Sequence, residues 1–286
     1  ASPYVTNTYL FGPELTIGGG FRNNWTRGND KLIPEKTNSF EVGVDLRFLQ
    51  NKLGIDFTYY KTNSINQILQ PRVSNATGYI LTYYNIGELN NEGVELTLSA
   101  TPISKENFTW TTALNMSHNN GRVNELIGGL DILYVTDVQV GTGKAASYNN
   151  GDFMAISGSV YQMDDAGNLL LDPATGYPLT TTSTTTYVGN REPDFIGGWN
   201  NNFTYKNWDL SFLFDFRKGG DVYNASEYLM TVYGTSKKTE NRGENISFMG
   251  SVLDPVTKES NIETRQVVAD ERFYKDIYTK HTPNFI

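Results

Sequence analysis

Residues 40–48 read Phe-Glu-Val-Gly-Val-Asp-Leu-Arg-Phe, and every second residue in this stretch is apolar. Strict alternation of this kind is the pattern of a β-strand that has one apolar face and one polar face. After the polar residues 49–52 the alternation resumes over residues 53–60. Two alternating runs with a short connection predict a β-hairpin, which we place at about residues 39–61.

The same pattern recurs twice, at about residues 93–117 and 195–217, which predicts six strands in three hairpins. The turns within the hairpins are short, whereas three long loops, about residues 62–91, 118–194 and 218–286, follow them. Tight turns at one end and long loops at the other are typical of outer-membrane β-barrels, whose long loops are extracellular. The fold class predicted for residues 1–286 is therefore all-β, an antiparallel transmembrane β-barrel segment with long extracellular loops.

An alternative fits the alternation equally well. A water-soluble antiparallel sheet with one buried and one wet face shows the same period, so a soluble extracellular β-sheet binding module or adhesin stays open. Aromatic residues favour the membrane: Phe108 and Trp110 follow one tight turn, and Tyr205 and Trp208 flank another. Amphipathic rings in such positions mark the membrane interface of a barrel.

The composition argues against several classes of function. The 286 residues include 23 basic and 31 acidic side chains and carry a formal charge of -8, which disfavours nucleic acid as a partner. The absence of cysteine excludes disulfides, thiol catalysis and cysteine-based metal sites. The two histidines, His118 and His281, are too far apart in sequence to indicate a histidine-rich metal site.

Two loop motifs carry residues that could serve binding chemistry. Residues 141–144, Gly-Thr-Gly-Lys, are followed by Ala145 where a phosphate loop needs Ser or Thr, so they predict an ordinary loop. Asp164, Asp165, Asn168 and Asp172 offer oxygen ligands, but without the spacing or terminal glutamate of an EF-hand. An Asp/Gly turn is the favoured interpretation, with a loop calcium site as the lesser alternative. We expect no cofactor and no enzymatic activity.

Several short motifs occur in the order of one known family. They are Leu-Ile-Pro-Glu-Lys-Thr at 32–37, Glu-Val-Gly-Val-Asp at 41–45, Asp-Phe-Thr-Tyr-Tyr-Lys at 56–61, Asn-Ile-Gly-Glu-Leu-Asn-Asn-Glu-Gly-Val-Glu-Leu at 85–96, Pro-Asp-Phe-Ile-Gly-Gly at 193–198 and Arg-Lys-Gly-Gly-Asp-Val-Tyr-Asn at 217–224. Together they resemble the barrel of the SusC/RagA-type TonB-dependent transporters of Bacteroidetes.

The resemblance implies a barrel of 22 strands closed around a plug, of which this chain is a fragment without the plug and TonB box. It further implies active import of an oligomeric nutrient, a glycan or a peptide, across the Gram-negative outer membrane. The implied partners are a SusD-like surface lipoprotein, the periplasmic TonB complex and outer-membrane lipid. A barrel of the same kind that imports a siderophore, haem or cobalamin is a further alternative.

Two groups of site residues follow from this reading. Charged side chains on the polar face of the strands are expected to face the barrel lumen, where charge is tolerated at membrane depth; they are Glu41, Asp45, Arg47, Glu95, Asp209, Asp215 and Arg217. Loop tyrosines are expected to contact the substrate or the lipoprotein; they are Tyr83, Tyr84, Tyr134, Tyr148, Tyr223 and Tyr233. Gly43 and Gly93, also on the polar face, are expected to leave room for a neighbouring side chain or backbone.

Overall fold

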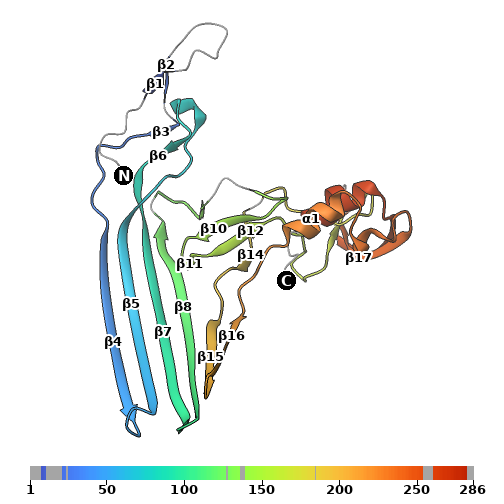
Figure 1. The fold of residues 1–286 in the computed structure, drawn as a ribbon. Coiled ribbons are helices and arrows are strands. Elements are labelled where there is room, and N and C mark those ends of the chain that lie inside the picture. Colours follow the sequence, from blue (N-terminus) through green and yellow to red (C-terminus); the bar gives the residue numbers. More distant parts are fainter. Residues whose placement is uncertain are drawn as a thin grey trace. The chain divides into compact units, whose positions relative to one another are not determined.

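A computed structural model describes residues 8–10, 21–23, 25–126, 128–135, 139–183, 185–253 and 260–281 (Figure 1). The chain forms two compact units. The first takes its described residues from Ala1–Leu133, Ser147–Phe153 and Glu192–Gly219, and the second takes them from Tyr134–Ala146, Met154–Arg191 and Gly220–Ile286.

The first unit is built on an antiparallel sheet that contains the six predicted strands. Its strand order is β16-β15-β8-β7-β5-β4, and the short β11 (Gly151–Asp152) pairs with β8. The strands are β4 (Lys36–Phe48), β5 (Leu53–Leu69), β7 (Tyr84–Lys105), β8 (Phe108–Leu126), β15 (Phe195–Tyr205) and β16 (Trp208–Lys218). Smaller elements in this unit are β1 (Thr8–Leu10), β2 (Phe21–Asn23), β3 (Thr26–Arg27), β6 (Leu81–Thr82) and the 3-10 turn η1 (Asn75–Thr77).

The pairing register sorts side chains onto two faces of this sheet, because side chains directly opposite each other on paired strands lie on the same face. One row across all six strands is wholly apolar: Leu46, Ile55, Leu98, Leu114, Trp199 and Phe214. The neighbouring row lies on the other face and is polar or glycine: Asp45, Asp56, Thr97, Asn115, Gly198 and Asp215. The predicted alternation therefore holds across the whole sheet.

Aromatic side chains gather on the apolar face beside the tight turns, as the sequence predicts. Phe108 pairs with Tyr205, and Tyr205 pairs with Trp208, whose exposed fraction is 79%. One row further from the turns, the rings of Trp110 and Phe203 stack with their centroids 5.6 Å apart. These rings occupy the place that an interfacial girdle takes in a membrane barrel.

Three strands are longer than the alternation predicts, because β5 runs to Leu69, β7 begins at Tyr84 and β8 ends at Leu126. The predicted loops 62–91 and 118–194 are shorter by these extensions. The face of the sheet that is apolar nearer the tight turns becomes polar in these extensions. Lys61 forms an ion pair with Glu92 at 3.3 Å, and Asn63 donates to Asn90 at 2.7 Å. The strands remain paired beyond their last alternating apolar residues, so the alternation could not predict these extensions.

The second unit contains two small sheets and short helices. One sheet has the order β14-β12-β10, and β13 pairs in parallel with β17 in the other, which has the order β13-β17-β18. The elements are β10 (Lys144–Tyr148), β12 (Ala155–Gly158), β14 (Thr186–Asn190), β13 (Leu170–Leu171), β17 (Asn245–Leu253), β18 (Ser260–Val268), α1 (Ala225–Val232), η2 (Lys237–Thr239), η3 (Phe273–Ile277) and η4 (Tyr278–Lys280). Strand β9 (Ile132–Tyr134) lies where the chain passes from the first unit to the second.

The core of the second unit is a cluster of Ala269, Phe273 and Tyr274, against which Tyr177 and Phe248 pack. The predicted loops 118–194 and 218–286 thus supply most of a folded unit rather than irregular chain; part of the second loop, residues 254–259 and 282–286, lies outside the described residues. No helix among the described residues has the length and apolar character needed to cross a membrane.

Candidate functional site

The seven charged residues predicted to face a lumen all lie on the polar face of the sheet, and all seven are exposed. Glu41, Asp45 and Arg47 are on the edge strand β4, where the Arg47 guanidinium forms an ion pair with Asp45 at 2.8 Å. Asp209 stands beside the tight turn that joins β15 to β16 and accepts a hydrogen bond from Thr204 at 2.7 Å.

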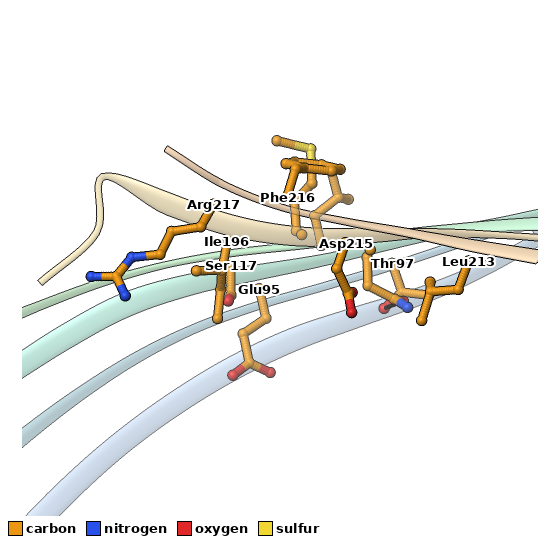
Figure 2. Close-up of a pocket in the computed structure, with 13 residues that line it drawn as sticks. Glu95, Thr97, Ser117, Ile196, Leu213, Asp215, Phe216 and Arg217 are labelled. Atoms are coloured by element: carbon orange, nitrogen blue, oxygen red, sulfur yellow. Dashed lines mark hydrogen bonds between the residues drawn. The ribbon is translucent and has the colours of Figure 1, made fainter. Parts of the chain in front are cut away.

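The structure brings the other three charged residues together around one hollow, shown in Figure 2. Its volume is about 720 Å³, and its walls come from β7, β8, β15 and β16. Glu95 and Arg217 lie on one cross-strand row, and Asp215 lies on the next. Figure 2 shows Glu95 and Asp215 on the opposite side of the sheet from the ring of Phe216.

Two aliphatic residues also line this hollow: Ile196 and Leu213 have exposed fractions of 46% and 56% although they occupy the polar face. They break the alternation, so the sequence pattern gave no reason to select them. The hollow therefore combines carboxylates, a guanidinium and aliphatic surface.

A second polar arrangement lies further along the same face. The Tyr60 side chain extends over Gly93 on the neighbouring strand, and its hydroxyl donates to Asn119 on the next strand at 2.7 Å. Asn119 in turn donates to Glu192, whose other oxygen accepts from the Gly121 backbone N–H at 2.8 Å. The sequence suggested room at Gly93 but not the residue that uses it, because the three strands meet only in the folded sheet.

The Tyr60 hydrogen bond can be tested by a small change. We expect Tyr60→Phe to lower the stability of the full-length protein by about 0.5–1.5 kcal/mol, since the hydroxyl is the only group removed. The measurement is the shift of the urea midpoint of the purified protein in detergent. Tyr59→Phe, on the opposite face of the same strand, is the matched control and should change little. Equal shifts for both variants would show that the bridge to Asn119 contributes nothing.

The six tyrosines selected from the loops do not form one site within either unit. Tyr83 is half-buried next to the exposed Tyr84, whose exposed fraction is 46%. The Tyr134 ring lies 4.6 Å from the Lys144 ammonium, a cation–π contact within the second unit, and Tyr148 is half-buried. Tyr233 follows α1 and is 77% exposed.

Tyr223 lies close to Gly141 and Gly143, in the segment that superficially suggested a phosphate loop. A side-chain carbon on Gly141 would lie 2.7 Å from the Tyr223 hydroxyl, so both ring and glycine are needed for this packing. Burial, followed by the neighbouring Tyr228, raises the pKa of Tyr223 to about 12. Tyr223 is thus a packing residue, and Tyr84 and Tyr233 are the two exposed members of the predicted contact set.

In the acidic turn that offers oxygen ligands for calcium, carboxylate oxygens accept hydrogen bonds from N–H groups of the turn itself. One Asp164 oxygen accepts from the backbone N–H groups of Ala166 and Asn168, and Asp172 accepts from Ala174 and Thr175. Hydrogen bonds from the Asn168 side chain, which are the largest cause, and from the backbone N–H groups of Asn168 and Ala166 lower the pKa of Asp164. In the part of the chain that the structure describes, no group of three or more His, Asp or Glu side chains is placed to hold a metal ion.

His281 is held against the second unit by Tyr161. The two rings stack with centroids 4.1 Å apart, and the Tyr161 backbone N–H donates to His281 Nδ1 at 3.1 Å. Burial lowers the pKa of His281 below its usual 6.5 and raises the pKa of Tyr161 to about 12. Both shifts favour the neutral side chains.

We therefore expect the His281 imidazole to titrate below pH 6.5 in the folded protein. Because the folded-state pKa is lower than the unfolded one, the contribution to stability is complete above pH 6.5 and is lost as the pH falls towards the folded value. The measurement is an NMR titration of protein labelled at histidine, with the His281 signal assigned by its absence in His281→Gln. A folded-state pKa at or above 6.5 would contradict this expectation.

Taken together, the fold and its faces define a class of protein. A sheet with one apolar face, one charged face and aromatic rings beside its tight turns is a section of a transmembrane β-barrel. The family model described as TonB dependent receptor-like, beta-barrel matches residues 2–212. The chain belongs to this family.

Relatives agree with this assignment. The chain is 28% identical over 244 residues to the TonB-dependent receptor P26 of Formosa agariphila, a match that covers 78% of this chain and 24% of the relative. It is 29% identical over 198 residues to the TonB-dependent receptor SusC of Bacteroides thetaiotaomicron, covering 64% of this chain and 19% of SusC. The chain thus spans about a quarter or less of the curated relatives that it matches.

A solved structure shows the same fold. The RagAB peptide importer in its closed-closed state superposes with a TM-score of 0.61 at 19% identity, over 78% of this chain and 25% of that chain. The predicted SusC/RagA-type resemblance and the predicted fold class are confirmed, with the strands forming an open section of a barrel. The match to a TonB-dependent receptor β-barrel favours the barrel over the soluble binding module.

Proposed function

We propose that this chain is part of a SusC-like transporter that imports an oligomeric nutrient, a glycan or a peptide, across the outer membrane. The observation that carries the proposal is the two-faced sheet in a chain 29% identical to SusC. Its apolar face suits lipid, and its charged face, with Glu41, Asp45, Arg47, Glu95, Asp209, Asp215 and Arg217, suits a wet lumen.

The topology supports an orientation. The three tight turns, at residues 49–52, 106–107 and 206–207, belong to one end of the antiparallel sheet, and the long connections belong to the other end. By the rule for outer-membrane barrels, the tight turns are periplasmic and the long connections are extracellular. In this proposal Tyr84 and Tyr233 are exposed on the outer side, where flat aromatic rings suit contact with a SusD-like lipoprotein or the nutrient.

The experiment has two parts, both on the full-length protein. The protein is tagged, extracted from outer membranes in mild detergent and examined by mass spectrometry, with an untagged strain as the control. We expect a surface lipoprotein to co-purify in a stoichiometric amount. In parallel, a strain lacking the gene is grown with defined glycans or peptides as the sole nutrient, and we expect one of these substrate classes to fail.

Two results would contradict the proposal. Uptake of a siderophore, haem or cobalamin without a bound lipoprotein would replace it by the alternative import class. Normal growth of the deletion strain on every oligomer tested, together with no bound lipoprotein, would remove the oligomer importer altogether.

A further inference from the structure

The last row of the apolar face, beside the tight turns, joins one lysine to three aromatic rings. Lys105 pairs with Phe108, Phe108 with Tyr205, and Tyr205 with Trp208, so these four side chains lie on the same face. In a transmembrane barrel the apolar face contacts lipid. Strands β7, β8 and β15 each have a paired neighbour on both sides. Further barrel strands extend such a sheet sideways, so they do not cover this row.

A second lysine stands beside the row. Lys206 follows Tyr205 in the turn between β15 and β16, and its ammonium lies 5.5 Å from the centre of the Tyr205 ring. The Lys206 backbone N–H donates to the Asn107 carbonyl oxygen at 3.1 Å, which joins this turn to the turn between β7 and β8. Both lysines are exposed, and the exposed fractions of Tyr205 and Trp208 are 52% and 79%. Two ammonium groups and two amphipathic rings therefore meet at the end of the apolar face.

The backbone of Lys206 has a conformation that suits other residue types better. Its φ is +52°, in the left-handed region, and two-residue hairpin turns prefer glycine or asparagine where φ is positive. A side chain held in a sparsely populated conformation points to a role beyond the local fold. At this position the lysine supplies a positive charge rather than a favourable turn.

We propose that Lys105 and Lys206 bind the phosphate of an anionic phospholipid, with the Tyr205 and Trp208 rings beside its glycerol and upper acyl carbons. Lysines near a membrane surface attract anionic lipid, and their methylene stems cover apolar surface while the ammonium stays among the headgroups. The charges on the two joined turns sum to a positive value, because Glu106 is the acidic residue of these turns and Asp209 lies on the opposite face.

This inference goes beyond the proposed import function. It needs the membrane sheet and its apolar face, but neither the nutrient nor the lipoprotein enters it. In the orientation proposed above, the bound phospholipid belongs to the periplasmic leaflet of the outer membrane.

The test measures lipid binding to the full-length transporter, purified in a neutral detergent. Phosphatidylglycerol and phosphatidylcholine with identical acyl chains are titrated separately, and bound lipid is followed by native mass spectrometry. The test variant is Lys105→Gln/Lys206→Asn, because asparagine suits the left-handed backbone of residue 206. One control, Lys105→Arg/Lys206→Arg, keeps both charges, and the other, Lys237→Gln/Lys275→Gln, removes two exposed charges from the second unit.

We expect the parent protein to bind phosphatidylglycerol more tightly than phosphatidylcholine. Each lysine removed should weaken phosphatidylglycerol binding by about 5-fold, and the test variant by about 10- to 30-fold. Both control variants should keep the parental affinity. Lys206→Asn alone should keep or raise the urea midpoint, because asparagine fits the turn better than lysine, and this separates a loss of lipid binding from a loss of fold.

Three results would overturn the inference. The first is an equal affinity of the parent protein for the two lipids, and the second is an unchanged phosphatidylglycerol affinity in the test variant. The third is an equal loss in the test variant and in the variant of the second unit, which would show that overall charge, not this site, sets the affinity. The assay contains no nutrient and no lipoprotein, so its outcome is distinct from that of the import experiments.

Discussion

Replacing Leu96 by arginine is expected to destabilise the full-length protein in the membrane by about 2–4 kcal/mol. Leu96 pairs with Phe57 and Met116 in the middle of the apolar face, two rows away from the polar extension that begins at Lys61 and Glu92. A guanidinium there must either lose its hydration in lipid or distort the barrel wall, and the cost is greatest at mid-depth.

The matched control is Thr97→Arg, which places the same side chain one residue along, on the polar face. Thr97 donates one exposed hydrogen bond to Asn115 at 3.0 Å, so the expected loss is no more than about 1 kcal/mol. The measurement is the urea dependence of the folded, heat-modifiable band of each variant in lipid vesicles. Similar losses in both variants would show that the face assigned to lipid is wrong.

Gly93→Ala is expected to have the second large effect, a destabilisation of about 1–3 kcal/mol from overpacking. A methyl group at this position would lie 2.4 Å from the Tyr60 hydroxyl and 2.5 Å from the His118 carbonyl oxygen. The tyrosine can rotate away only by giving up its hydrogen bond to Asn119, and the carbonyl belongs to the paired backbone of β8.

Gly121→Ala provides the control, because a methyl group on Gly121 would find its nearest neighbours at 3.5 and 3.6 Å, which is ordinary contact. The double variant Tyr60→Ser/Gly93→Ala separates the two clashes. It should recover part of the loss by removing the ring, while the clash with His118 stays. Stability is again followed by urea midpoint, and an unchanged midpoint for Gly93→Ala would mean that the strands separate at this point without cost.

The sequence predicted the six strands of the membrane sheet because one physical constraint, an apolar face beside a polar face, is repeated in each of them. Residues 40–48 carry this constraint without exception, and the structure pairs Leu46 with Ile55 and Asp45 with Asp56, each pair on the face that the alternation predicts. Successive side chains of a strand point to opposite faces, and this alternation also places Glu95, Asp215 and Arg217 on one face.

Other features could not be predicted in this way. The hollow depends on Ile196 and Leu213, which have the wrong polarity for their face, and on four strands from two distant segments of the chain. Most strands of the second unit are short, and the longest two, β17 and β18, have nine residues each. Its core joins Tyr177 to Phe273, residues nearly one hundred positions apart in the numbering. Packing between such distant residues produces no periodic pattern in the local sequence, so it could not be predicted.

The pairing of β8 with β15 also bears on how the chain assembles. The hairpins β4–β5, β7–β8 and β15–β16 join neighbouring strands through short turns, whereas β8 and β15 are separated by residues 127–194. Closing a long segment costs more chain entropy than closing a tight turn, and contacts between distant residues form late. We expect each hairpin to arise early and the β8–β15 pairing to form last within this section, so that the folding chain passes through a state in which the edges of β8 and β15 are unpaired.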